Sequence, residues 1–310
     1  MRVNLRDIIN KEERLAPGHR LCAGCAEPVI VRQILLAIDD PVVVSTATGC
    51  LEVSTTVYPY TSWRVPWIHS AFENAATTLS GIEAAYKALR RTGKIPQDKE
   101  IKLIAFGGDG ASYDIGLQFI SGALERGHRI VYVCLNNEAY MNTGIQRSSA
   151  TPRGASTTTS PAGKVIPGKV QWRKPFTHIM AAHDIPYVAQ AAPHNYRDLM
   201  RKVKKAISVD GPAVLNILAP CPRGWRHPSD QTMAISKLAA DTCYWPLYEI
   251  DHGKVIVNYK PRNKVPVAEW LKAQGRFRHL FQPANAWLLE EIQAKVDEEW
   301  ERLLKEEANS

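Results

Sequence analysis

The sequence lacks any long apolar run. Hydrophobic residues make up 45% of its 310 residues, yet no stretch reaches the roughly 18 consecutive apolar residues that a membrane-spanning helix needs. Its first residues, Met1 to Asp7, also lack the apolar core of a secretory signal peptide. We therefore expect a cytoplasmic protein that has no membrane partner.

Basic residues are in excess, but they form no compact run interleaved with aromatic residues. The formal net charge is +8. Because nucleic-acid-binding proteins concentrate Lys and Arg on one face or along one helix, nucleic acid is not an expected partner. The charge fits a solvated surface or a docking face for an acidic electron carrier, and it does not separate the two. Internal repeats and low-complexity blocks are also missing.

Strand-like and helix-like segments alternate through the middle of the chain. Short apolar runs predict strands at 41–46, 101–106, 129–135, 187–190 and 213–218. Apolar residues at helical spacing predict helices at 28–39, 72–90, 115–126, 176–182 and 196–208. This alternation predicts an α/β fold, a doubly wound parallel sheet with helices on both faces. Gly81 lies inside a predicted helix, where glycine costs about 1 kcal/mol, so we expect it to permit a close backbone approach.

The chain divides into three parts by pattern. Residues 1–20 are charged and aperiodic, and they are expected to form an N-terminal arm. Residues 21–225 hold the alternating segments and a long Ser-, Thr-, Pro- and Gly-rich loop at 148–169, a type of loop that is usually functional or mobile. Residues 226–310 are expected to be an extended C-terminal arm, with helices near 267–273 and 284–304, that packs on partner subunits rather than forming a core.

A glycine-rich turn with one carboxylate follows the strand predicted at 101–106. Glycines such as Gly108 and Gly110 allow the backbone to approach a phosphate closely. Asp109 between them can offer its carboxylate to Mg²⁺. The alternative interpretation of this motif alone is a structural turn.

A second turn follows the next predicted strand. Asn137 comes 137 − 109 = 28 residues after Asp109, about one helix and one strand further along. Both turns lie at the carboxyl ends of strands, where doubly wound sheets bind ligands. Asp109, the Asn137 side-chain oxygen and the Ala139 carbonyl could therefore share one Mg²⁺ with two diphosphate oxygens. The spacing resembles the Gly-Asp-Gly…Asn motif of thiamine-diphosphate enzymes.

Clustered cysteines in a cytoplasmic chain indicate metal or redox chemistry more than disulfides. Four of the six stand in loops shaped by glycine or proline: Cys22, Cys25, Cys50 and Cys221. Only one close pair is present, whereas a zinc ribbon shows two. Four thiolates suit a 4Fe–4S cluster, and the spacing leaves a cluster, zinc and unligated thiols open. Cys134 and Cys243 are expected to be small buried hydrophobic residues.

Several segments together resemble the thiamine-diphosphate and cluster domain of pyruvate:ferredoxin oxidoreductases. They are residues 21–25, 47–50, 62–70, 72–74, 108–110, 140–144, 150–152, 221–225 and 242–248. The resemblance covers roughly residues 15–255 and points to a β subunit of the 2-oxoacid:ferredoxin oxidoreductase family, which includes closely similar oxalate oxidoreductases. It implies the thiamine-diphosphate-binding fold. The implied reaction is oxidative decarboxylation of a small 2-oxoacid, pyruvate by default, with electrons passing through a 4Fe–4S cluster to ferredoxin.

The resemblance also implies a role for individual positions. The residues that match the four cluster ligands are Cys22, Cys25, Cys50 and Cys221. The residues that match the magnesium ligands are Asp109, Asn137 and, through its carbonyl, Ala139; the family often has Thr at the position of Asn137. Asn142 matches a residue beside the thiazolium ring and the substrate and is the expected catalytic residue. The remaining expected cofactor-binding residues are Gly108, Gly110 and Thr143.

Features missing from the chain define its expected partners. In this family the glutamate beside the pyrimidine ring comes from another domain or chain, and six cysteines cannot hold three 4Fe–4S clusters. The resemblance therefore implies an α-type subunit that provides the glutamate, a ferredoxin-type subunit with further clusters, and an external ferredoxin. The choice among pyruvate, oxalate and 2-oxobutyrate, the use of coenzyme A, the physiological direction and the stoichiometry stay open.

Two rival interpretations remain. A non-redox thiamine enzyme, such as a decarboxylase, would keep the fold but would need no cluster, so the four cysteines argue against it. A zinc-stapled, non-catalytic scaffold would explain the cysteines. Asp109, Asn137 and Asn142 argue against a scaffold, because it would need no cofactor site.

Overall fold

One eight-stranded sheet runs through the protein. The computed structural model describes residues 8–96, 98 and 100–310, so the first part of the expected N-terminal arm lies outside the described residues. The strands are β1 (Val42–Thr46), β2 (Trp67–His69), β3 (Lys102–Gly108), β4 (Val131–Asn136), β5 (Tyr187–Ala191), β6 (Ala213–Leu218), β7 (Tyr248–Asp251) and β8 (Lys254–Val257). Their order across the sheet is β2-β1-β3-β4-β6-β5-β7-β8. The first six strands pair in parallel, and β7 and β8 pair antiparallel.

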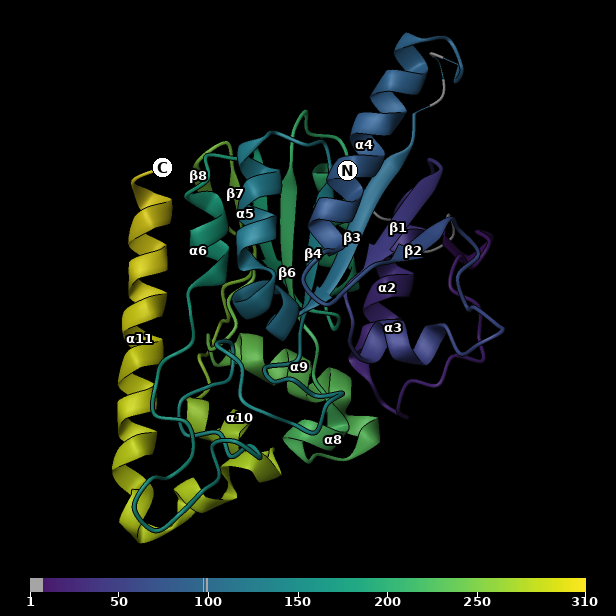
Figure 1. Cartoon of the computed structure of the whole chain (residues 1–310). Coiled ribbons are helices and arrows are strands. Elements are labelled where there is room, and N and C mark those ends of the chain that lie inside the picture. Colours follow the sequence, from purple (N-terminus) through teal and green to yellow (C-terminus); the bar gives the residue numbers. More distant parts are fainter. Residues whose placement is uncertain (1–7, 97, 99) are drawn as a thin grey trace.

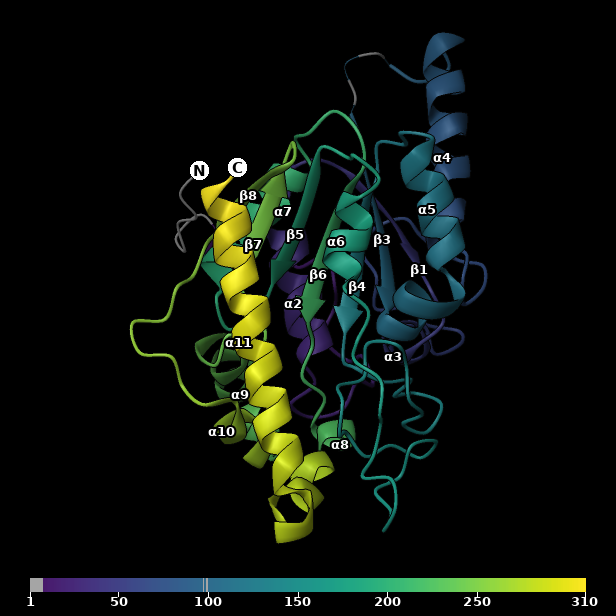
Figure 2. The ribbon, with the colours of Figure 1, turned by 90° about the vertical axis from the view of Figure 1, so that its left-hand side faces the viewer.

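Helices cover both faces of the sheet (Figures 1 and 2). The α-helices are α2 (Ala26–Leu36), α3 (Cys50–Thr55), α4 (Ala75–Arg91), α5 (Leu117–Glu125), α6 (Phe176–Ala181), α7 (Tyr196–Ala206), α8 (Pro222–Trp225), α9 (Thr232–Asp241), α10 (Val267–Lys272) and α11 (Ala286–Ala308). Tighter 3₁₀ turns are η2 (Ser229–Gln231), η3 (Gly275–Phe281) and η4 (Pro283–Asn285), and η1 (Gly110–Ile115) is a π-helical turn. The doubly wound α/β prediction is confirmed for β1 and β3 to β6.

The core is split by the sheet into two layers. On one face, α2 and α7 bury residues such as Ile34 and Val203 against the strands. On the other face, α4, α5, α6 and α11 bury residues such as Leu79, Ile120 and Leu303. Every residue of β4 and of β6 is buried. Because strands in the middle of a parallel sheet are covered on both faces, they read in sequence as continuous apolar runs rather than as alternating ones.

The C-terminal segment differs from the expectation. Residues 226–310 do form a core: they bury Trp245, Trp270 and Phe277 in a third apolar cluster below the sheet. They also add β7 to β5, and α11 packs against β8 (Figure 1). The expected helices in this segment appear as α10 and α11, but the two strands were missed. Each has only four residues, too few to show a period. Whether partner subunits contact the outer side of this segment stays a prediction.

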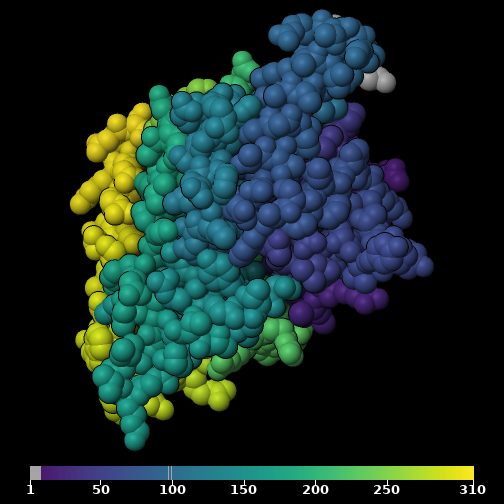
Figure 3. Space-filling view, viewed as in Figure 1, coloured from purple at the N-terminus to yellow at the C-terminus, as the bar shows by residue number. Residues whose placement is uncertain are grey.

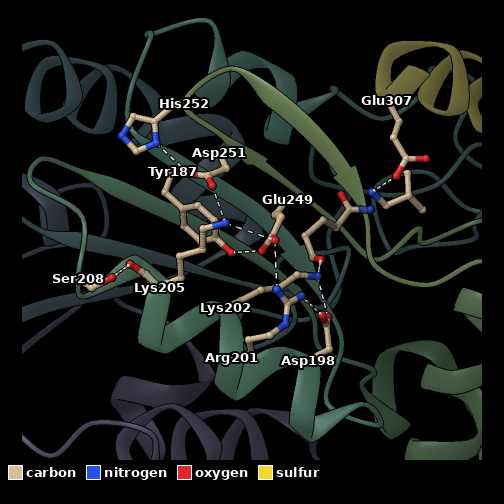
Figure 4. A network of polar contacts seen from close by, with 12 residues as sticks. Tyr187, Asp198, Arg201, Lys202, Lys205, Ser208, Glu249, Asp251, His252 and Glu307 are labelled. Carbon is tan, nitrogen blue, oxygen red and sulfur yellow. Dashed lines mark hydrogen bonds and ion pairs between the residues drawn. The ribbon is translucent and has the colours of Figure 1, made fainter. Parts of the chain in front are cut away.

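A buried charge network fixes β7 to the sheet (Figure 4). Glu249 in β7 is 2% exposed and lies beside Ala189 of β5. It accepts hydrogen bonds from the Tyr187 hydroxyl at 2.5 Å and from Arg201 at 3.1 Å. These partners hold the pKa of Glu249 below its usual value even though burial alone raises it. Because its carboxylate is paired, Glu249 can be buried in a strand. A polar residue at this position breaks the apolar pattern, so the pattern did not reveal β7.

Among the described residues, none of the helices combines the length and the apolar character needed to cross a bilayer.

No other segment of the described backbone packs closely against Gly81. It lies in α4, and a Cβ built on it would meet no atom within 4 Å. The expectation that it permits close backbone contact is therefore wrong, because this helix face is exposed.

We predict that Gly81→Ala raises the free energy of unfolding by up to about 1 kcal/mol, because alanine loses less backbone entropy in a helix than glycine does. Thermal unfolding of the complex under anaerobic conditions would measure this as a higher midpoint. A lower midpoint would show that the position has a contact that the fold does not reveal.

Candidate active site

A cleft opens where the parallel strands end. The registers of β1, β3, β4 and β6 bring the turns after these four strands to one end of the sheet. In Figure 2 the arrowheads of β4 and β6 point towards this end, where α8 lies. The cleft holds about 630 Å³ of empty space, including the space at its open mouth. Residues from the turns after β1, β3 and β4 line it. On the surface, the N-terminal segment, the loop after β4 and the segment after β6 meet in this region (Figure 3).

All seven predicted cofactor-binding residues line this cleft together. They are Gly108, Asp109, Gly110, Asn137, Ala139, Asn142 and Thr143, with Cys50 beside them. Asn142 and Thr143 are exposed, and the Thr143 hydroxyl donates to Gln146 Oε1 at 2.6 Å within its own turn. The prediction that these residues gather at one site is thus matched by the geometry, while their roles stay predictions.

The glycines of the cleft have different surroundings. A Cβ on Gly108 would meet no protein atom within 4 Å, and the same holds for Gly49 across the cleft. Both residues line the cleft, so a side chain on either would enter space that a ligand can use. A Cβ on Gly110 would instead lie 2.3 Å from the Tyr140 ring. The missing side chains of Gly108 and Gly49 therefore leave a cradle in which a ligand can contact the backbone directly, as in phosphate-binding turns.

Asp109 is fully buried between β3 and η1. Its side-chain oxygen Oδ2 accepts a hydrogen bond from the Ser148 hydroxyl, while Oδ1 has no partner. Burial raises the pKa of Asp109 to about 7, because the ionised form is poorly solvated there. An unpaired buried carboxylate oxygen is costly unless a cation or donor reaches it. A π-helical turn such as η1, which begins directly after Asp109, is itself frequent at functional sites.

Asn137 shows the same feature. Its side-chain nitrogen Nδ2 donates to Glu27 Oε1 at 3.0 Å, which orients the amide and leaves Asn137 Oδ1 without a partner. Its backbone carbonyl accepts from Trp225 Nε1 at 2.7 Å. Unpaired oxygens on Asp109 and Asn137 at one cleft are the ligand type that Mg²⁺ prefers. The residues present therefore fit a hard divalent cation.

Two residues at this site were missed by sequence reasoning. Ser148 orients Asp109 from the long loop predicted near the site, and hydroxyl residues in such a loop carry no distinctive signal. Glu27 lines the cleft, is 4% exposed, and has one oxygen without a partner. Burial raises the pKa of Glu27 to about 7. Its position two residues after Cys25 was the only available signal, and burial of a carboxylate cannot be seen from that spacing.

The four cysteines of the expected cluster are neighbours. Cys50 lines the cleft itself, and Cys22, Cys25 and Cys221 lie close enough that thiolates at these positions repel one another. None of the four forms a disulfide. Cys134 and Cys243, in contrast, are buried in apolar clusters, which confirms that part of the prediction.

Three of these cysteines stand at helix starts. Cys25 precedes α2, Cys50 opens α3, and Cys221 caps α8, where its sulfur accepts from the Gly224 N–H at 3.4 Å. Free N–H groups at helix starts favour negative charge. Burial raises the pKa of the Cys25, Cys50 and Cys221 thiols, so without a positive partner they stay protonated.

A single metal ion fits the cysteines poorly. Within the part of the chain that the structure describes, no three His, Cys, Asp or Glu side chains gather closely enough to hold one ion. A zinc ribbon needs four ligands around one ion. A 4Fe–4S cluster is wider than one ion and is held by four thiolates, so the number and type of these residues fit a cluster.

Comparisons with known proteins agree with this geometry. The family described as "Thiamine pyrophosphate enzyme, C-terminal TPP binding domain" matches residues 47–217. A protein of Thermotoga maritima named pyruvate synthase subunit PorB is 52% identical over 98% of this chain and 96% of its own length. Ketoisovalerate oxidoreductase subunit VorB of Pyrococcus abyssi is 42% identical over 95% of this chain and 93% of its own length.

A solved structure shares the fold. It is a 2-oxoglutarate:ferredoxin oxidoreductase from Magnetococcus marinus, with a TM-score of 0.56 and 18% sequence identity over 88% of this chain and 97% of that chain. The fold and the sequence match place the chain in the class of thiamine-pyrophosphate-binding domains. Within that class, the chain belongs to the β-subunit family of 2-oxoacid:ferredoxin oxidoreductases, and it is an oxidoreductase subunit of a multi-subunit complex.

We predict that Gly108→Ala abolishes thiamine diphosphate binding while the complex still folds and assembles. The added methyl group meets no protein atom but occupies the cradle. Isothermal titration with thiamine diphosphate and Mg²⁺ would measure the loss, and Gly81→Ala serves as the matched control at a glycine far from the cleft. Wild-type affinity in Gly108→Ala would exclude this turn as the diphosphate site.

Proposed function

We propose that the chain is the β subunit of a pyruvate:ferredoxin oxidoreductase that binds thiamine diphosphate with Mg²⁺ and carries one 4Fe–4S cluster. The observation that carries the proposal is one cleft in which the unpaired oxygens of Asp109 and Asn137 lie together with Cys50. A cofactor site and an electron acceptor site would then share one wall, which suits oxidative decarboxylation rather than a non-redox thiamine reaction.

The chain's own residues would hold the cofactor by its charged end. Asp109, Asn137 and the Ala139 carbonyl would bind Mg²⁺, and the open backbone at Gly108 would accept the diphosphate. When bound, thiamine diphosphate supplies the nucleophilic carbon and the electron sink that a 2-oxoacid needs to lose CO₂. Ser148 and Glu27 would fix the orientation of Asp109 and Asn137 respectively.

Asn142 would act at the reacting end. It lines the same cleft as Cys50. An amide that is held at this place can orient a substrate carboxylate or carbonyl and stabilise negative charge that develops on it. The apolar side chains of Phe72 and Met141 line the same cleft and would keep bulk water away from the substrate.

The cluster would be held by Cys22, Cys25, Cys50 and Cys221. Free N–H groups at the starts of α2, α3 and α8 would stabilise the negative charge of the thiolates. Because Cys50 lies on the wall of the cleft, electrons would leave the site over a short path. A ferredoxin-type subunit and an external ferredoxin would receive them, and an α-type subunit would provide the glutamate at the pyrimidine ring.

We predict that Cys221→Ser lowers the iron content of the purified complex and removes ferredoxin-linked activity, since serine is a much weaker ligand for this cluster. Cys243→Ala is the matched control, because Cys243 is buried in the third apolar cluster and takes no part in the cleft. Iron analysis and low-temperature paramagnetic resonance would measure the effect. Equal iron in both variants would remove Cys221 from the ligand set.

Pyruvate is the proposed substrate. The pyruvate synthase relative is 52% identical to this chain and the ketoisovalerate relative 42%, both over more than nine-tenths of their length. The second relative makes the branched 2-oxoacid 2-oxoisovalerate the second candidate, in addition to oxalate and 2-oxobutyrate. The apolar walls of the cleft suit a small 2-oxoacid that carries one carboxylate.

Viologen reduction by the native complex, purified anaerobically, tests the proposal. Each of pyruvate, 2-oxoisovalerate, 2-oxobutyrate and oxalate would be supplied with and without coenzyme A. We expect the highest kcat/KM with pyruvate and a requirement for coenzyme A. Preference for 2-oxoisovalerate would reassign the substrate, and activity with oxalate without coenzyme A would indicate an oxalate oxidoreductase. No reduction with any 2-oxoacid, from a complex that holds iron and thiamine diphosphate, would contradict the redox assignment.

A further inference from the structure

Glu138 stands between two proposed ligand positions. It separates Asn137 from Ala139 in the turn after β4, and its φ of +67° lies in the left-handed region. Residues other than glycine rarely adopt this conformation, and they keep it only where their surroundings enforce it. The backbone at Glu138 helps to set the direction in which Asn137 and the Ala139 carbonyl point, in addition to the contacts that Glu27 and Trp225 make with Asn137. The contacts that keep Glu138 in this conformation therefore also stabilise the proposed metal-binding turn.

The Glu138 side chain is held by the C-terminal segment. It is fully buried, and its two oxygens have separate partners. Oε2 pairs with the Arg276 guanidinium, and Oε1 accepts from the Tyr244 hydroxyl at 2.9 Å. Arg276 and Tyr244 both lie within residues 226–310, more than 100 residues further along the chain.

Arg276 is itself fixed on several sides. It is 2% exposed, and its Nε and Nη2 atoms donate to Gln274 Oε1 at 2.9 and 2.7 Å. Its guanidinium group lies over the Trp225 ring at 4.2 Å, a cation–π geometry. The same Trp225 donates to the Asn137 carbonyl. Arg276 and Trp225 therefore contact each other and reach two adjacent residues of the turn.

Stability alone does not explain such a pair. Removing two charges from water is expensive, and a buried ion pair is often no more stabilising than apolar residues of the same volume. Buried pairs can instead select one conformation among several. Here the selected conformation is the strained one that aims Asn137 and Ala139 at the cleft.

We propose that Glu138 and Arg276 form a positioning pair, through which the C-terminal segment sets the geometry of the magnesium-binding turn. The inference rests on the proposed function, because it assigns the pair to the cation and diphosphate site. Neither side chain touches the ligands; the pair acts through the backbone on either side of Glu138. Its loss would weaken cofactor binding and leave the cysteines unaffected.

Arg276→Met in the whole complex tests the pair. We expect the Kd of thiamine diphosphate at fixed Mg²⁺, and the Mg²⁺ concentration at half-saturation, to rise about 10- to 100-fold, the range seen when residues that orient metal ligands are replaced. Isothermal titration would measure both. The iron content should equal that of the wild type. Arg276→Lys keeps the charge beside Glu138 but loses the double contact with Gln274, so it should recover part of the affinity.

Lys202→Met is the matched control. Lys202 in α7 is fully buried and pairs with Asp198 at 2.6 Å, so the substitution also breaks a buried ion pair, but one that does not line the cleft. It should lower the thermal midpoint and leave both binding constants unchanged. An equal loss of cofactor affinity in both variants would attribute the effect to general destabilisation and would overturn the inference.

The remaining outcomes are separable. An assembled Arg276→Met complex with wild-type binding constants overturns the positioning role and leaves the proposed function intact. If Arg276→Met does not assemble, Glu138→Gln carries the test, because the amide keeps the shape of the side chain; unchanged binding in that variant overturns the inference, and a several-fold rise in Kd supports it. A wild-type complex that binds no thiamine diphosphate would overturn the proposed function and this inference with it.

Discussion

The rest of the site depends on two buried oxygens without hydrogen-bond partners, one on Asp109 and one on Asn137. Both belong to buried side chains, and a buried polar atom without a partner is unfavourable unless a ligand satisfies it. The other atoms of these side chains are already engaged, by Ser148 and by Glu27. The chain therefore does not close the site with its own donors. In the proposed function, these two oxygens would be ligands of Mg²⁺, and a bound diphosphate would supply further ones.

The parallel sheet is the reason why these atoms meet. Asp109 and Asn137 follow neighbouring strands, β3 and β4, whose register is fixed by paired residues such as Gly108 and Leu135. The turns after β1 and β6 end at the same edge and carry Cys50 and Cys221. Residues that are far apart in sequence thus converge without any special contact between their loops, because every carboxyl end of the parallel strands points the same way.

Features that are continuous in the chain could be predicted from the sequence, whereas features that depend on contacts between distant residues could not. The apolar runs of β4 and β6 and the Gly-Asp-Gly turn are continuous in the chain, so they could be predicted. The strand β7 could not, because Glu249 interrupts its apolar pattern, and the partners that satisfy its carboxylate, Tyr187 and Arg201, come from other elements. Glu27 and Ser148 were missed for the same reason, since their importance lies in partners about 110 and 39 residues away. Glycine at position 81 suggested a close contact that the exposed helix does not make.

The thiamine pyrophosphate-binding domain and most of the proposed cluster ligands occupy different stretches of the chain. The region shared with thiamine pyrophosphate enzymes, residues 47–217, contains Asp109 and Asn137 but leaves out three of the four cysteines and the whole segment after β6. The segments outside it still reach the turn after β4, through Glu27 from one side and Trp225 from the other. In the proposed enzyme, the elements that bring the cluster cysteines therefore also brace the magnesium-binding turn. The contacts of Glu27 and Trp225 with Asn137 would thus hold the cofactor site at a fixed position relative to the cluster cysteines.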